Sequence, residues 1–272
     1  MNPLSKILSP SHLPPLPPGA LSAVVLHWTG GNNSCSALDR LHYHFAVDGA
    51  PKVHRGIFTV RSNARPFRCS TGYAAHALNF NAGAVGIALC GMAGAQESPF
   101  RIGTAPINEA QWEIGAQLAA EVCLAYGIPI TPQTVLQHGE IEANCGVPQR
   151  GKWDVCRLPW APLLPASTVC EEWRKLVSAK MNALRQSPRP ERRLFLQVGA
   201  QTVQVVGAKK LSGSWMVEGV HLAAALEKVT GKRYGFSGYL PLRVHLSRFG
   251  FVVVGGDFAP NADTVTIKWV GK

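Results

Sequence analysis

The stretch LSAVVLHWTGG, residues 21–31, decides the fold and places the first candidate functional residue. Its apolar and β-branched residues form a short run that is typical of a buried strand. The run leads to His27, and Gly30 and Gly31 open a loop rich in Gly, Asn and Ser. We therefore expect a core strand that presents the His27 imidazole at its end.

Residues 38–47 also predict a strand, because they lead into Asp48-Gly49, a pair that favours a tight hairpin turn. Tyr43 and His44 would then lie on this strand. Since neighbouring side chains of a strand point to opposite faces, His44 should point away from Tyr43, which makes it a poor candidate ligand.

The next patterns alternate between strands and helices. Residues 85–89 and 134–138 predict two further core strands. Apolar residues recur at helical spacing over residues 108–126, which Gly127 and Pro129 close. Residues 167–185 predict a second long helix. This order predicts an α/β fold, in which a central mixed β-sheet is flanked by helices.

Composition divides the chain into two domains. A Pro-rich leader at residues 1–20 opens a first domain over residues 1–185, and a linker follows at residues 186–192. Residues 193–272 predict a small α+β accessory module. Its expected elements are a helix at 217–229 and strands at 194–198, 202–206, 251–254 and 264–269.

The charge is strongly positive. Lys and Arg number 27 against 16 Asp and Glu, which gives a formal charge of +11. Such a surface attracts polyanions such as nucleic acid, anionic lipid or an acidic cell envelope, and it also keeps a protein soluble. No nucleic-acid motif and no alternation of basic with aromatic residues accompanies the charge, so we expect no nucleic-acid partner.

Neither a secretory signal nor a membrane span is expected. Five prolines interrupt residues 7–18, and they prevent the helical apolar region of a secretory signal. The longest apolar run, residues 82–95, is rich in Gly and much shorter than the ~20 residues of a spanning helix. We therefore expect a protein that is made in the cytoplasm without a signal peptide and does not insert stably into membranes.

The seven cysteines are irregularly spaced and include no CxxC pair. They predict neither a disulfide framework nor a four-thiolate metal site. We expect most of them to be buried as small apolar residues.

Three residues form a candidate metal site. Catalytic zinc is generally bound by three protein ligands and leaves a fourth position for water. His27 and His138 each end a predicted strand, and Asp154 follows Lys152 by two residues. Each has an ordinary explanation by itself, because a lone His beside a core strand is more often structural and a lone Asp is more often a surface charge.

The order of the motifs favours a metal site over these separate structural explanations. HWTGG begins at His27, Tyr43 precedes the Asp48-Gly49 turn, NFN at residues 79–81 precedes VGI, and HGE at His138 precedes KWD at residues 152–154. This pattern, over residues 21–160, resembles the type-2 N-acetylmuramoyl-L-alanine amidase family. That family includes phage endolysins, muropeptide-recycling amidases and the peptidoglycan recognition proteins of animals.

The resemblance implies roles for individual residues. His27, His138 and Asp154 match the zinc ligands of the family, with one Zn²⁺ per chain. Tyr43 and Lys152 match residues that assist the transition state. The substrate is then bacterial peptidoglycan.

Three further residues match positions that line the substrate groove in relatives: Thr29, His76 and Asn79. One position departs from the recycling amidases, which commonly carry a Glu where this chain has Ala88. Glu140 and Glu142 could orient a ligand imidazole or could simply be solvated carboxylates, and the sequence leaves both readings open.

The expected function is zinc-dependent hydrolysis of the amide bond between N-acetylmuramic acid and L-alanine, in a bacteriolytic phage or prophage endolysin. Such an enzyme reaches the cell wall after holin-type release, and the accessory module would bind the wall. Two alternatives stay open, a non-catalytic peptidoglycan receptor and a bacterial recycling or autolytic amidase. The sequence does not predict the oligomeric state.

Overall fold

The structure is a computed structural model that describes residues 6–186, 194–198, 201–205, 209–211, 214–230, 239–241, 251–255 and 264–269. Contacts within the chain divide it into two units, Met1–Ser187 and Pro188–Lys272. Of the predicted linker, only Gln186 lies within the described residues. The first five residues of the predicted leader lie outside them.

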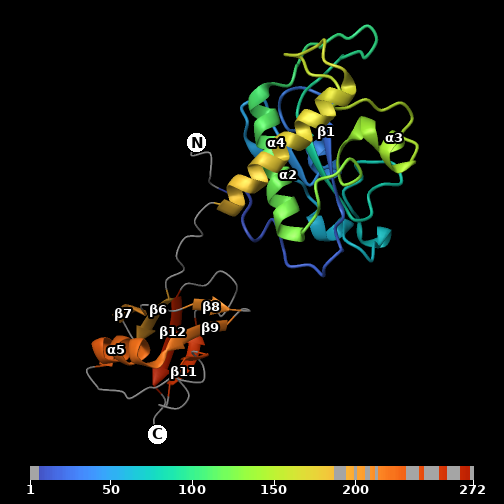
Figure 1. Cartoon of the computed structure of the whole chain (residues 1–272). Coiled ribbons are helices and arrows are strands. Elements are labelled where there is room, and N and C mark those ends of the chain that lie inside the picture. Colours follow the sequence, from blue (N-terminus) through green and yellow to red (C-terminus); the bar gives the residue numbers. More distant parts are fainter. Residues whose placement is uncertain are drawn as a thin grey trace. The chain divides into compact units, whose positions relative to one another are not determined.

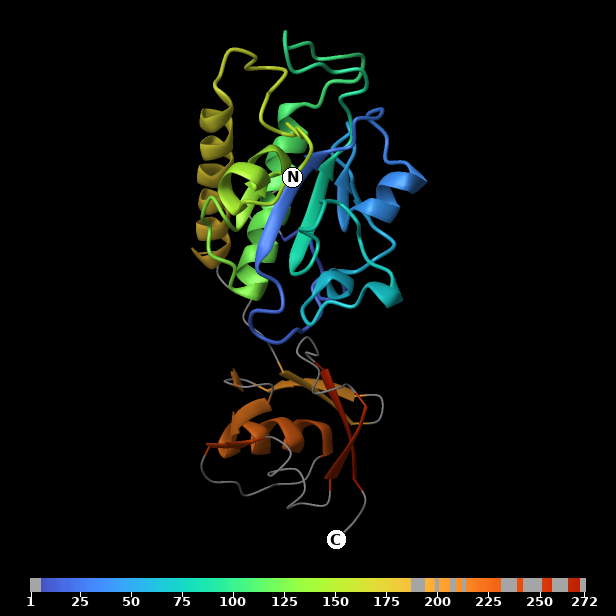
Figure 2. The same ribbon diagram turned by 90° about the vertical axis from the view of Figure 1, so that its right-hand side faces the viewer.

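A mixed five-stranded sheet forms the centre of the first unit, in the order β3-β2-β4-β1-β5 (Figure 2). β1 pairs in parallel with β4 and β5, β2 pairs in parallel with β4, and β3 pairs antiparallel with β2. This confirms the mixed sheet predicted from the sequence. The strands are β1 (Ala23–Trp28), β2 (Phe45–Val47), β3 (Val53–Arg55), β4 (Ala84–Leu89) and β5 (Val135–Gln137).

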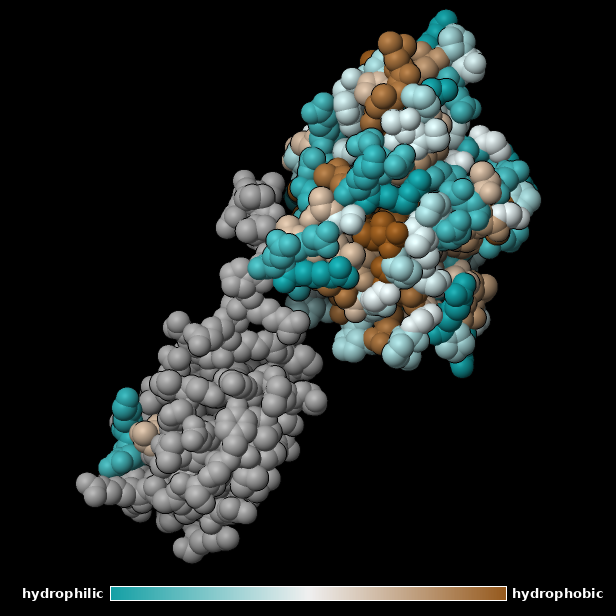
Figure 3. Space-filling view, in the orientation of Figure 1, coloured by the Kyte–Doolittle hydropathy of each residue, from teal (hydrophilic) through white to brown (hydrophobic). Residues whose placement is uncertain are grey.

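Two long helices, α2 (Glu109–Tyr126) and α4 (Ala166–Gln186), lie side by side over one face of the sheet (Figure 1). Asn108 caps the start of α2, and Gly127 ends it in the left-handed conformation. Both helices were predicted to within one residue at each end. The outer side of α4 forms a mainly hydrophilic band in Figure 3. In the described part of the chain, no helix is both long and apolar enough to cross a membrane.

Alternation along β1 separates the two faces of the sheet. Val24 and Leu26 pack into the core under the helices, whereas Ala23 and Val25 belong to a smaller cluster on the other face. His27 follows the same alternation as Val25. Its imidazole therefore lies on the face that α2 and α4 leave uncovered.

The predicted strand at residues 38–47 was wrong in its first half, which is the helix α1 (Ala37–His42). The reason is a capping box, in which the Ser36 hydroxyl accepts from the Asp39 N–H and the Asp39 carboxylate accepts from the Ser36 N–H. Tyr43 ends this helix rather than lying on a strand. The predicted turn is confirmed, because β2 pairs with β3 around Asp48.

The other short elements of the first unit are η1 (Val60–Asn63), η2 (Cys69–Thr71), η3 (His138–Glu140) and α3 (Ile141–Cys145). Of these, η3 and α3 follow β5 directly. Ile141 packs with Val25 and Leu136 in the cluster on the same face of the sheet as His27.

The second unit contains strands at the four expected places, β6 (Leu194–Val198), β7 (Gln201–Val205), β11 (Phe251–Gly255) and β12 (Thr264–Trp269). They form one sheet in the order β11-β12-β6-β7. A second sheet of β8 (Lys209–Leu211), β9 (Ser214–Glu218) and β10 (Tyr239–Pro241) was not predicted. The helix α5 (Gly219–Thr230) buries Leu222, Ala225 and Leu226. The function of this segment as an accessory module stays a prediction.

His44 should make the stability of the first unit depend on pH. It is 2% exposed, and its Nδ1 accepts a hydrogen bond of 2.9 Å from the Gly86 N–H. Burial lowers the pKa of His44 from 6.5 to about 4. Between pH 6.5 and pH 4, His44 is therefore protonated in the unfolded chain but neutral in the folded chain. The free energy of unfolding falls as the pH falls through this range.

We expect His44→Asn, whose amide oxygen can accept from Gly86, to lose less stability on acidification than the wild type. The difference should be on the order of 2 kcal/mol between pH 7 and pH 5, since one pKa unit is worth about 1.4 kcal/mol. Urea unfolding of both metal-free proteins at the two pH values measures it. Equal losses in the two proteins would show that His44 is not the group that titrates.

Candidate metal centre

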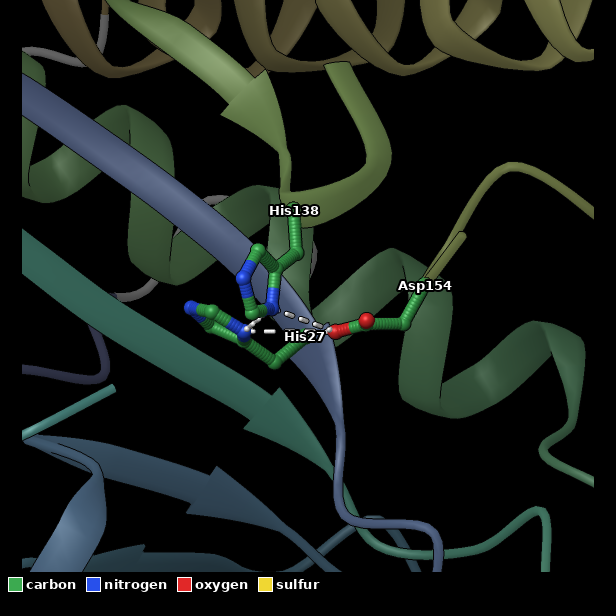
Figure 4. Close-up of side chains that lie close together, drawn as sticks. All are labelled: His27, His138 and Asp154. Carbon is green, nitrogen blue, oxygen red and sulfur yellow. Dashed lines mark hydrogen bonds and ion pairs between the residues drawn. The ribbon is translucent and has the colours of Figure 1, made fainter. Parts of the chain in front are cut away.

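The structure brings together the three residues that the sequence suggested as ligands. His27 lies near the end of β1, His138 opens η3 directly after β5, and Asp154 lies in the loop before α4. Their side chains point toward one another (Figure 4). All three are buried, with exposed fractions of 1%, 5% and 6%.

Three atoms converge at the centre of this group. The Nδ1 atoms of His27 and His138 are 3.0 Å apart, and the Oδ2 atom of Asp154 lies 3.3 Å from the first and 3.2 Å from the second. A tetrahedral zinc site with bonds of about 2.0–2.1 Å places its ligand atoms about 3.3 Å apart. The separations therefore fit the edges of such a site.

Close packing of the loop against η3 places Asp154. The Gly139 N–H donates a 2.7 Å hydrogen bond to the Asp154 carbonyl. A Cβ at Gly139 would come within 2.7 Å of the Cys156 Sγ and 3.0 Å of the Trp153 Cα, so only glycine allows this approach. The Trp153 ring also packs edge-on against Trp28, with centroids 4.6 Å apart, which ties the loop to β1.

Gln149 fixes which nitrogen of His138 faces the centre. The Gln149 Nε2 donates to the carbonyls of Leu78 and Val147, at 2.8 and 3.2 Å, so its Oε1 must face His138. That oxygen lies 2.9 Å from the His138 Nε2, which therefore carries the proton. In the neutral imidazole, the Nδ1 then presents a lone pair to His27 and Asp154.

A second chain of hydrogen bonds, through His76, fixes which nitrogen of His27 faces the centre. The His76 Nε2 lies 3.4 Å from the Ala84 carbonyl, which can only accept, so the His76 Nδ1 is left to accept from the His27 Nε2 at 3.1 Å. The His27 Nδ1 thus also presents a lone pair to the centre. His76 reaches this position because Gly86 has no Cβ, which would lie 2.6 Å from the His76 Cγ.

Two lone pairs and a carboxylate oxygen thus meet in a buried space, an arrangement that calls for a cation. Burial lowers the pKa of His27 to about 4, so its imidazole is neutral at physiological pH and free to act as a ligand. The residues fit a zinc ion, with one coordination position left for water.

Tyr43 and Lys152 border this centre. The Tyr43 ring lies 5.1 Å from the His27 ring, measured between centroids. Burial raises the pKa of Tyr43 well above its usual value, and the nearby Asp154 adds to this effect. Lys152 is exposed, and its positive charge helps to lower the pKa of His27. Both side chains are therefore close enough to act at the metal centre electrostatically.

The profile of the N-acetylmuramoyl-L-alanine amidase family matches residues 17–155, more than half of the chain. The chain belongs to this family. It is therefore a peptidoglycan amidase by membership, and the buried group of His27, His138 and Asp154 could hold a metal ion. Among curated proteins, none matches the chain.

The three predicted groove residues of the amidase differ in their surroundings. The Thr29 hydroxyl accepts from the N–H groups of Gly31 and Gly91, at 3.3 and 3.1 Å, so it also holds the loop together. Asn79 is exposed and has a positive φ of 53°. His76 is only 6% exposed, and its observed partner is His27. A contact of any of the three with substrate stays a prediction.

Glu140 fits neither of the readings that the sequence left open. It is partly buried, and both of its carboxylate oxygens accept from Arg174, at 2.8 and 2.9 Å. It therefore links η3 to α4. The residue that does orient a ligand is Gln149, whose N–H in turn donates to the Glu142 carboxylate. Sequence reasoning missed Gln149, since only its place between His138 and Lys152 pointed to it.

We expect Gln149→Leu to weaken zinc binding by about 10–100-fold, because the His138 ring loses the acceptor that fixes its tautomer. Gln149→Glu, which keeps an acceptor there, should recover most of the affinity. Competition with a chromophoric chelator measures the Kd. Gln133→Leu, at an exposed glutamine, is the matched control, and an unchanged Kd in Gln149→Leu would contradict the assignment.

Proposed function

We propose that this chain is a zinc-dependent enzyme that hydrolyses the amide bond between the lactyl group of N-acetylmuramic acid and L-alanine. The supporting observation is the convergence of three lone-pair atoms from His27, His138 and Asp154 in a buried space, with the other nitrogen of each imidazole already occupied. A purely structural cluster would have no need to direct both Nδ1 atoms at a carboxylate.

Three residues would bind the zinc ion, and two others hold the imidazole ligands in position. A zinc ion held by the three ligands would lower the pKa of water from about 16 to about 7, so that hydroxide is available at neutral pH. Gln149 and His76 keep the two imidazoles from rotating out of position. The chain thereby fixes the geometry of the site before the substrate arrives.

In this proposal, Tyr43 and Lys152 stabilise the negative charge that develops on the substrate. Attack on the lactyl carbonyl moves this charge to its oxygen. The raised pKa of Tyr43 keeps its hydroxyl protonated and therefore able to donate a hydrogen bond. No protein partner of this hydroxyl is found in the described part of the chain. The leaving amine needs a proton as well, and Tyr43 and Lys152 each carry one.

We propose further that the enzyme is a phage or prophage endolysin that is made in the cytoplasm and reaches the wall after holin-type release. Ala88 supports this assignment, because it pairs with His27 in the sheet register at the position where recycling amidases commonly carry a Glu. The formal charge of +11 suits an anionic wall. The second unit would then hold the enzyme on its target.

The first test compares the wild type with two variants on purified peptidoglycan. His138→Ala should lose one zinc per chain and all amine release, since a ligand is missing. Lys152→Ala should keep its zinc but lose about 10²–10³-fold in rate, the usual effect of removing one such donor. Elemental analysis and the release of L-alanine amino groups measure the two properties.

Lys52→Ala, at an exposed lysine away from the centre, is the matched control and should behave as the wild type. If the wild type carries zinc and binds several wall preparations but releases nothing from them, the site binds peptidoglycan without cleaving it. The non-catalytic receptor would then replace the enzyme.

The endolysin assignment predicts a preference for intact walls. We expect faster amine release from intact sacculi than from soluble muropeptides at equal concentrations of the scissile bond, because a lytic enzyme acts on the polymer. Rates with the two substrates at low substrate concentration give the ratio of kcat/KM. A preference for soluble muropeptides would favour the recycling amidase instead.

A further inference from the structure

A second group of metal-ligating side chains lies apart from the centre at His27. Cys35 comes from the loop after β1, Asp39 from the first turn of α1, and Cys90 from the position directly after β4. Each offers one ligand atom, and these atoms lie within 4.8 Å of one another. Cys90 is fully buried, whereas Cys35 and Asp39 are partly exposed.

We propose that Cys35, Asp39 and Cys90 bind a second, thiophilic divalent cation such as zinc. Thiolates select soft ions, and two sulfurs with one oxygen are a donor set that zinc accepts. In a tetrahedral site with Zn–S bonds of about 2.3 Å, ligand atoms lie about 3.8 Å apart. The ligand atoms already lie within 4.8 Å of one another, which exceeds that spacing by at most about 1 Å. Cys35 and Asp39 are partly exposed, so water can reach the fourth position.

Two of the three ligands are already held in place. The Asp39 carboxylate accepts from the N–H and the hydroxyl of Ser36, at 2.8 and 2.7 Å. The backbone of Cys90 is fixed at both ends, because its N–H donates to the Val47 carbonyl and its carbonyl accepts from the Gln111 Nε2. Cys35 lies in the loop between β1 and α1, so its side chain has the most freedom to adjust to an incoming ion.

The charge of the group also favours a cation. In the described residues, Asp39 forms no ion pair with Lys or Arg, so its carboxylate has no cationic partner. A thiol must lose its proton to bind a metal ion, so uptake should release protons and weaken as the pH falls.

Binding of this cation would also affect Tyr43. This consequence, unlike the site itself, rests on the proposed function, because it matters for catalysis only if Tyr43 is catalytic. The Asp39 carbonyl accepts the Tyr43 N–H at 2.9 Å, across the last turn of α1. A cation between Asp39 and Cys90 would tie this helix to the end of β4. The second site would thus steady the residue that faces His27.

The experiment is a titration of the reduced, metal-free full chain with Cd²⁺ alone, followed by sulfur-to-cadmium absorption in the ultraviolet. The centre at His27 contains no thiolate, so the absorption reports only on cysteine sites. We expect the wild type to gain this absorption, and Cys35→Ser to lose it or to need at least about 10-fold more Cd²⁺. Cys35 is partly exposed in a loop, so this variant should fold, and circular dichroism checks that it does.

Three control variants separate the sites. Cys69→Ser removes an exposed cysteine outside the group and should leave the absorption unchanged. Cys170→Ala breaks the buried pair of Cys156 and Cys170, whose sulfurs lie 3.6 Å apart, and should also leave it unchanged. His138→Ala should keep the absorption too, so that a failure of the second site is distinguishable from a failure of the proposed amidase centre.

A second readout is independent of absorption. Zn²⁺ should protect Cys35 from alkylation by iodoacetamide and leave the labelling of Cys69 unchanged, as measured by mass spectrometry. The proposal is overturned if the wild type shows no sulfur-to-cadmium absorption, or if Cys35→Ser keeps it in full. A disulfide between Cys35 and Cys90 that forms in air despite excess Zn²⁺ would also overturn it, because the pair would then be a redox couple.

Discussion

The hydrogen bonds that occupy the outer nitrogens of His27 and His138 are the constraint on which the site depends. They force both Nδ1 lone pairs toward the Asp154 carboxylate, within 3.3 Å or less. Burying unpaired charge and unpaired lone pairs costs several kcal/mol, so a cation bound between them should stabilise the folded state. The ligand atoms of the folded chain are therefore already arranged to bind a cation.

Room for this arrangement comes from the size of the residues along β4. Val85, Ile87 and Leu89 pack into the core under α2 and α4, and the residues between them are small. Gly86 lets His76 lie against the strand, and Ala88 leaves the side of His27 free of a second acid. One strand thus builds the core with one face and the floor of the site with the other, because its side chains alternate.

Features that depend on local sequence patterns could be predicted, whereas contacts between residues far apart in the chain could not. Hydrophobic spacing and end signals predicted α2, α4 and most strands, and family motifs predicted the three ligands. The helix α1 was missed because the hairpin signal at Asp48 was extended backwards over the capping box of Ser36. Gln149 and His76 touch ligands 11 and 49 residues away, and no spacing rule gives such contacts before the fold is known.

Tyr43 follows a helix, α1, that is held in place by polar contacts rather than by hydrophobic packing. The helix that it ends has six residues and buries none of them, and helices shorter than about 12 residues are marginal without tertiary support. What holds α1 is polar: the capping box at Ser36, the bond from the Arg40 Nε to the Arg55 carbonyl, and the contact of His42 with the Ala75 carbonyl. Such bonds contribute only about 1 kcal/mol each. A cation bound between Asp39 and Cys90 would therefore add the one strong tertiary link that the helix lacks, and the precision of the donor beside His27 would depend on it.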